Sequence, residues 1–136
     1  MNRDIRDTVI VGGGVSGMSA GIFSARLGLN TVLLERLMPG GQVINAEKVE
    51  DYPGFPNGVS GAELVGLMQE QAMSAGTEIS LTEVTEIKPG DSGIDVVTYD
   101  SSIRTRTVII AGGSTLTKLS VPGEDKLEGS GVSYCA

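Results

Sequence analysis

The chain has 136 residues, of which 40% are hydrophobic and 20% are charged, and this composition excludes intrinsically disordered and collagen-like proteins while allowing one domain with its own core. It contains no histidine and one cysteine, which excludes histidine-based catalytic triads, an internal disulfide framework and an all-cysteine metal site, so a cofactor is expected to carry any chemistry. The net charge of −7, without a basic cluster or an apolar run of membrane-spanning length, predicts a soluble, cytoplasmic protein that binds neither nucleic acid nor membranes.

The first predicted element is a buried strand at residues 8–11, which leads directly into a glycine-rich turn and a predicted helix at residues 15–27. Gly12, Gly14 and Gly17 have the G-x-G-x-x-G spacing of a turn that holds a pyrophosphate. Gly12 lets the chain turn at the end of the strand, Gly14 leaves room for a phosphate, and Gly17 lets the helix lie close to the strand. The start of the helix would then offer its free N–H groups to the anion.

A second apolar run, at residues 31–34, predicts a parallel strand and completes one right-handed βαβ unit. Glu35 ends this strand, 18 residues after Gly17, where a carboxylate accepts hydrogen bonds from the ribose hydroxyls of an adenosine. The alternative is a glycine-rich turn and a helix-capping glutamate that bind no ligand. The two features together favour a dinucleotide site.

The middle of the chain predicts a long ordered loop at residues 36–60 and a helix at residues 62–75, capped by Ser60 with Glu63. The acidic side chains of this loop, at positions 47, 50 and 51, are expected to be solvated rather than to hold a metal. Four strands follow, at residues 77–81, 83–88, 94–99 and 103–110. We expect the first three to form an antiparallel meander, inserted before the last strand returns to the parallel sheet. The predicted fold class is therefore α/β, a Rossmann-like parallel sheet with an inserted β-meander.

Several motifs along the chain resemble one known family. They are the glycine turn with Glu35, PGGQ at 39–42, VEDYPG at 49–54, VIIAGG at 108–113, VPGED at 121–125 and GVSYCA at 131–136. Their order and spacing resemble the N-terminal, FAD-binding segment of low-molecular-weight thioredoxin reductases. The resemblance covers nearly the whole chain.

This resemblance implies an FAD flavoprotein that passes electrons from NADPH through FAD to a Cys-x-x-Cys disulfide and on to thioredoxin, as a homodimer. It implies that Cys135 is catalytic, as one half of the redox disulfide. It places Val84 near the adenine, Asp51 near the isoalloxazine ring, and the adenosine at Glu35 and Arg36. The pyrophosphate would lie at Gly12, Gly13, Gly14, Val15, Ser16 and Gly17, and the flavin side would be lined by Gly40, Gly41, Gln42, Ala111, Gly112 and Gly113.

The sequence departs from the family pattern at two positions, with Asp51 in place of an asparagine and Gly112 in place of a threonine. It also stops at Cys135-Ala136, before the second cysteine and the NADPH domain. We therefore expect residues 1–114 to be the first segment of an FAD domain and residues 115–136 a linker. The isolated chain is expected to be inactive, with residues 108–110 on an open sheet edge.

Two alternatives remain at this stage. One is a stand-alone FAD- or nucleotide-binding module without turnover. The other is a related flavin ferredoxin–NADP reductase, which the ending Ser133-Tyr134-Cys135-Ala136 makes the weaker of the two.

Overall fold

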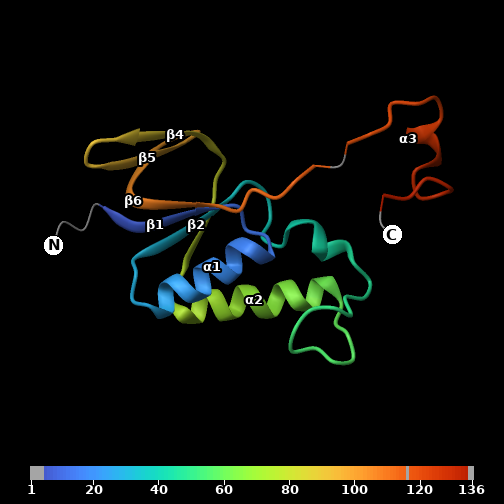
Figure 1. The fold of residues 1–136 in the computed structure, drawn as a ribbon, viewed down its shortest axis with the longest axis horizontal. Coiled ribbons are helices and arrows are strands. Elements are labelled where there is room, and N and C mark those ends of the chain that lie inside the picture. Colours follow the sequence, from blue (N-terminus) through green and yellow to red (C-terminus); the bar gives the residue numbers. More distant parts are fainter. Residues whose placement is uncertain (1–4, 116, 135–136) are drawn as a thin grey trace.

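The computed structural model describes residues 5–115 and 117–134, and it places six strands in one sheet with two helices packed against one face (Figure 1). The strands are β1 (Arg6–Val11), β2 (Thr31–Glu35), β3 (Glu78–Leu81), β4 (Val84–Gly90), β5 (Gly93–Thr98) and β6 (Ser102–Ile110). The helices are α1 (Val15–Arg26), α2 (Gly61–Ala75), the short α3 (Glu124–Leu127) and the 3-10 helix η1 (Gly41–Asn45). The predicted α/β class is confirmed.

The strand order is β3-β2-β1-β6-β5-β4, with β1 at the centre of the parallel part. β1 pairs in parallel with both β2 and β6, so that Ile10 lies opposite Leu33 on one side and Ile109 on the other. α1 connects β1 to β2, which confirms the predicted βαβ unit. Strands buried between two neighbours in this way carry apolar residues on both faces, as the sequence of β1 does.

The membership of the meander was predicted wrongly in one respect. Residues 77–81 were expected to be its first strand, but β3 pairs in parallel with β2 at the edge of the sheet. The reason is that α2 lies between β2 and β3 and serves as a second helical crossover, which returns the chain in the parallel direction. The antiparallel meander consists instead of β4, β5 and β6, and β6 belongs to both parts of the sheet.

Side chains from alternate positions of the strands form two apolar clusters, one on each face of the sheet. Ile10 and Leu33 point to the helix face and pack with Met18 of α1 and Leu64 of α2. The neighbouring residues of the same strands pack on the other face, with Val96 of β5; they are Val9, Val32 and Leu34. None of the helices in the described part of the chain has the length and apolarity that a membrane span needs.

The predicted start of α2 is confirmed. The hydroxyl of Ser60 accepts a hydrogen bond from the backbone N–H of Glu63 at 3.2 Å, and Gly76 ends the helix in the left-handed conformation, at φ 103°. Gly61 has a role that was not predicted. A Cβ at this position would lie well under 3.0 Å from the carbonyl oxygen of Val43, because α2 packs directly on η1.

β6 changes its partner along its length, and Thr105 is the one described residue of this strand that pairs on both sides. Residues from Ser102 to Thr105 pair with β5, while 106–110 pair with β1 alone among the described strands. Ile110 is 74% exposed, so the end of this strand presents apolar side chains and unpaired backbone groups. The open edge expected at residues 108–110 is therefore found.

Candidate functional site

The glycine turn lies between β1 and α1 at the carboxyl edge of the parallel strands. Gly12 has φ 105°, and a Cβ there would lie well under 3.0 Å from the carbonyl oxygen of Ala111. A Cβ at Gly17 would similarly overlap the carbonyl oxygen of Gly12. The N–H of Gly12 donates to the carbonyl of Leu34 at 2.8 Å. The predicted steric need for glycine at positions 12 and 17 is confirmed, because β2, β6 and α1 pack closely around the turn.

Gly14 is different, because the space beside it is open. A Cβ there would meet only the Cα of Gly41, at 3.8 Å. Gly14 is the N-cap residue of α1, and neither a capping side chain nor an acidic residue occupies the first turn of this helix. A helix start of this kind carries partial positive charge and free N–H groups, so it suits an anion such as a phosphate.

Glu35 holds the glycine turn directly. One carboxylate oxygen accepts a hydrogen bond from the N–H of Gly13 at 2.7 Å, and the other accepts from the N–H of Leu37 at 3.0 Å. This fixes a half-buried carboxylate beside the glycine turn, where the sequence predicted it. That Glu35 accepts hydrogen bonds from ribose hydroxyls stays a prediction.

Arg36 and Val84 are two further predicted residues. Arg36 is exposed, and its guanidinium lies 3.9 Å from the carboxylate of Glu83. Val84, the next residue after Glu83, begins β4 and packs against the apolar cluster on the face of the sheet opposite the helices. The structure thus brings Glu35, Arg36 and the start of β4 to the same end of the sheet.

The segment 39–42 crosses over the glycine turn. The N–H of Gly40 donates to the carbonyl of Gly13 at 2.8 Å, and Gly14 and Gly40 form an isolated parallel bridge. Gly40 has φ 140°, which favours glycine, and it is buried. The amide of Gln42 donates a hydrogen bond to the carbonyl of Ser114. This contact links the loop to the segment 111–114 that follows β6.

The segment after β6 borders the turn from the other side. The N–H of Ala111 donates to the carbonyl of Val11 at 2.8 Å, so the end of β6 stays paired beside the glycine turn. Gly112 has nothing within 4 Å of the place where a Cβ would stand, and Gly113 adopts φ 67°. The position of Gly112 therefore has room for the threonine that the family pattern has there.

Asp51 is not part of this cluster of contacts. It lies beyond η1, where it is exposed and lines a shallow hollow of about 300 Å³ with neighbouring residues of 50–56. No described contact joins it to the glycine turn. Among the residues described, no group of three or more metal-ligating side chains is found.

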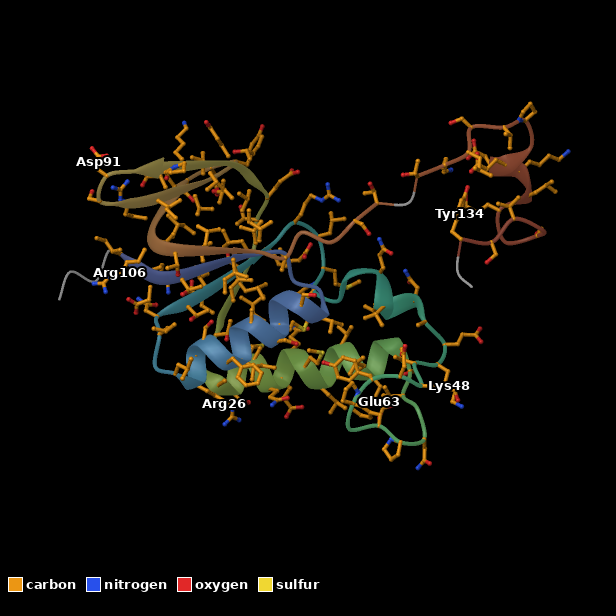
Figure 2. The ribbon with its side chains drawn as sticks, viewed as in Figure 1. Arg26, Lys48, Glu63, Asp91, Arg106 and Tyr134 are labelled. Atoms are coloured by element: carbon orange, nitrogen blue, oxygen red, sulfur yellow. The ribbon has the colours of Figure 1, made fainter. Side chains whose placement is uncertain are left out.

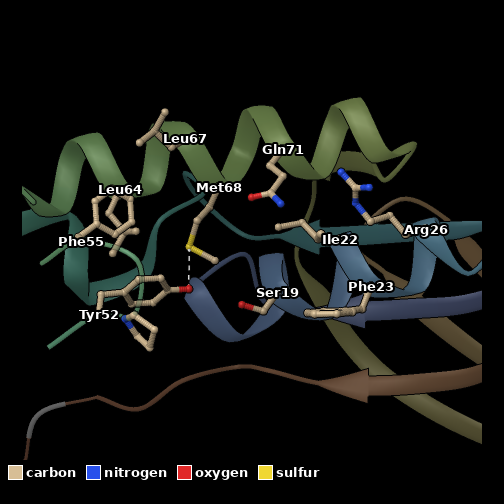
Figure 3. A pocket seen from close by; sticks show the side chains of 11 residues that line it. Ser19, Ile22, Phe23, Arg26, Tyr52, Phe55, Leu64, Leu67, Met68 and Gln71 are labelled. Carbon is tan, nitrogen blue, oxygen red and sulfur yellow. Dashed lines mark hydrogen bonds between the residues drawn. The ribbon is translucent and has the colours of Figure 1, made fainter.

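A larger hollow, of about 410 Å³, lies between α1 and α2 beside the loop that carries Tyr52 (Figure 3). Phe23 of α1 and Leu67 of α2 line it and are 70% and 45% exposed. At its floor the hydroxyl of Tyr52 donates to the sulfur of Met68 at 3.5 Å. This hollow was not predicted, although apolar residues on the outer faces of two predicted helices could have indicated it.

The last described part of the chain, residues 117–134, is called the connector here. It lies outside the layers of sheet and helices, and Figure 2 shows Tyr134 within it. Its one buried residue is Glu124, which is 4% exposed. The predicted catalytic residue Cys135 lies outside the described residues.

Comparisons with known proteins agree with this arrangement. The family model for pyridine nucleotide-disulphide oxidoreductases matches residues 6–136. The chain is 42% identical over 132 residues to the thioredoxin reductase of Bacillus subtilis, covering 97% of this chain and 42% of that protein.

Two solved structures are also similar. The thioredoxin reductase of Lactococcus lactis is 39% identical, with a TM-score of 0.84, and the match covers 96% of this chain and 43% of that one. The thioredoxin reductase of Streptococcus pyogenes is 37% identical, with a TM-score of 0.86 and coverage of 98% and 44%. The chain thus spans less than half the length of each of these relatives. The match to the family model over nearly all of the sequence shows that the chain belongs to the pyridine nucleotide-disulphide oxidoreductase family.

Proposed function

We propose that this chain is the FAD-binding segment of a thioredoxin reductase. The observation that carries the proposal is the convergence of four segments on one end of the sheet: the glycine turn, Glu35, the segment 39–42 and the segment 111–114. A site for the adenosine half alone would need only the first two. The segments 39–42 and 111–114 extend the site beyond the adenosine half, as the flavin half of FAD would require.

The residues present fit such a cofactor. The open space beside Gly14 and the uncapped start of α1 suit the pyrophosphate, which the N–H groups of Val15, Ser16 and Gly17 would face. Glu35 would accept the ribose hydroxyls, with Arg36 and the backbone of Val84 at the adenosine.

The flavin side would be bordered by Gly40, Gly41 and Gln42 on one side and by Ala111, Gly112 and Gly113 on the other. For Asp51 to lie near the isoalloxazine ring, the loop that carries this residue would have to bring it there. Bound FAD would supply the redox chemistry, while this chain binds and orients it.

The whole protein would pass electrons from NADPH through FAD to a Cys-x-x-Cys disulfide and then to thioredoxin. The names of the relatives, which are thioredoxin reductases, support thioredoxin as the final acceptor. Cys135 would supply one of the two sulfurs, since thiol–disulfide exchange requires a thiolate and a partner sulfur. The division into an FAD segment, 1–114, and a linker, 115–136, belongs to this proposal. So do a homodimeric assembly, which the family resemblance implies, and a cytoplasmic location.

The proposal is tested on the full-length protein. Purified protein should be yellow, should release flavin on denaturation, and should reduce thioredoxin when given NADPH. A colourless preparation that takes up no FAD but binds NAD would contradict it. A coding sequence that ends after codon 136 would favour the stand-alone binding module, whereas a second cysteine three positions after Cys135 would favour the reductase.

A further inference from the structure

The connector is organised around one carboxylate. Glu124 accepts hydrogen bonds from the backbone N–H groups of Leu119 at 2.9 Å and Ser120 at 2.6 Å. The hydroxyl of Tyr134 donates to the same side chain at 2.5 Å. One buried group therefore binds both the first residues and the last described residue of the connector.

Apolar packing does not explain how this segment holds its shape. Within residues 117–134 every hydrophobic side chain is at least partly exposed, and Leu119 is 76% exposed. Short-range backbone hydrogen bonds hold part of the segment. The carbonyl of Leu127 accepts from the N–H groups of Ser130 and Val132 at 2.8 and 3.0 Å. The ion pairs of Lys118 are solvent-exposed, and such pairs contribute little. The contacts of Glu124 thus join the two ends of the described connector.

Ser120 has an unfavourable backbone conformation, which the contacts of Glu124 stabilise. Ser120 has φ 58°, and it is the only residue other than glycine with a positive φ among those described. A residue in the left-handed region persists only where its surroundings hold it there. The short bond from its N–H to Glu124, at 2.6 Å, is a contact that holds it there.

We propose that Glu124 is a positioning residue for the redox cysteine, acting through the phenol of Tyr134. This rests on the proposed function, in which Cys135 is one half of the redox disulfide. Cys135 follows Tyr134 by one peptide bond, so the carboxylate that fixes Tyr134 also fixes where the chain enters the redox motif. Loss of the phenol would free this entry point and leave the FAD site intact, because no described contact joins Glu124 or Tyr134 to the glycine turn.

The test uses the full-length protein with Tyr134→Phe, which keeps the ring and removes only the donor. Thioredoxin reduction should fall in kcat by about tenfold or more, since small misplacements of reacting groups are costly. Bound FAD and NADPH-driven reduction of a dye that accepts electrons directly from flavin should not change. Tyr99→Phe is the matched control, because it removes the hydroxyl of a tyrosine that is 88% exposed and lies just after β5.

Substitutions of the carboxylate separate positioning from charge. Glu124→Gln keeps one acceptor oxygen and should retain more thioredoxin reduction than Glu124→Ala. Asp125→Asn removes the same charge from the adjacent, exposed position and should behave as wild type. Equal kcat for wild type, Tyr134→Phe and Glu124→Ala would overturn the proposal.

Amide hydrogen exchange tests the inference independently of the enzymatic reaction. In Tyr134→Phe the amides at residues 130–134 should exchange faster, and in Glu124→Ala those of Leu119 and Ser120 should as well. If the wild-type protein fails to reduce thioredoxin, the proposed function is wrong. Unchanged exchange in both variants would then reject the positioning function on its own.

Discussion

Replacing Gly17 by alanine tests the packing of the glycine turn. In an open helical position, glycine to alanine stabilises a protein by about 0.5–1 kcal/mol. At Gly17 the new methyl group would overlap the carbonyl oxygen of Gly12, a backbone atom. Gly12 has little room to shift, because the carbonyl of Ala111 stands where its Cβ would be and its N–H is bonded to the carbonyl of Leu34. Overpacking against backbone of this kind costs about 3 kcal/mol, the upper end of the usual range.

Gly66 provides the matched comparison. It lies in the interior of α2, and nothing is found within 4 Å of the place where its Cβ would stand. Gly66→Ala should therefore stabilise the protein by about 1 kcal/mol, while Gly17→Ala should destabilise it by about 2 kcal/mol net. The two variants carry the same chemical change, and they should differ by about 3 kcal/mol in the free energy of unfolding.

Urea unfolding followed by circular dichroism measures this difference. With m-values of about 1–3 kcal/mol per molar for domains of this size, the two midpoints should lie roughly 1–3 M apart. The order of midpoints should be Gly66→Ala, wild type, then Gly17→Ala. A Gly17→Ala midpoint at or above that of wild type would refute the reasoning, because it would mean that β1 and α1 separate without cost.

Four other predictions follow from the same structure. Gly14→Ala should leave the unfolding midpoint nearly unchanged, since its methyl group would meet only Gly41 at 3.8 Å, but it should weaken FAD binding in a flavin titration of the full-length protein. Glu35→Ala should weaken FAD binding by about 1.5–3 kcal/mol and Glu35→Gln by less, and equal affinities would identify Glu35 as a structural group only. The bond from Tyr134 lowers the pKa of Glu124 from 4.5 and, with the carboxylate as partner, raises the pKa of Tyr134 to about 12. The contribution of this pair to stability should be fully present between pH 4.5 and 10, and should be lost as the pH falls through the lowered pKa of the carboxyl or rises through about 12. Absorbance titration of tyrosinate should show this late ionisation in wild type and not in Tyr134→Phe. The isolated chain should bind FAD weakly, show no NADPH-dependent disulfide reduction and self-associate through residues 106–110 of β6. A monodisperse monomer in light scattering that retains stoichiometric FAD would contradict this.

The parts of the fold that were predictable are those with short-range causes. The glycine spacing, the apolar run before it and the carboxylate at Glu35 each depend on neighbours within one βαβ unit. The cap of α2 at Ser60 is equally local. These elements lie where the sequence placed them.

Other features depend on contacts that no pattern in the sequence specifies. The sequence at residues 77–81 predicts a strand but not its partner, and the direction of this strand was decided by the packing of α2. Gly61 is required because α2 begins against the carbonyl of Val43, a contact between two elements. The bond between Glu124 and Tyr134 spans ten positions and depends on the turns between them, so neither residue could be singled out beforehand.

The central position of β1 has a consequence for how the chain folds as it is synthesised. One neighbour of this strand, β2, follows about twenty residues later, so the βαβ unit can form early. The other neighbour, β6, pairs Val11 with Ile110, almost a hundred residues further along the chain. At about 5–20 residues per second, the ribosome needs roughly 5–20 s to supply it. During that interval one side of an apolar strand is unpaired in the nascent chain, and the glycine turn lacks the neighbour that closes it.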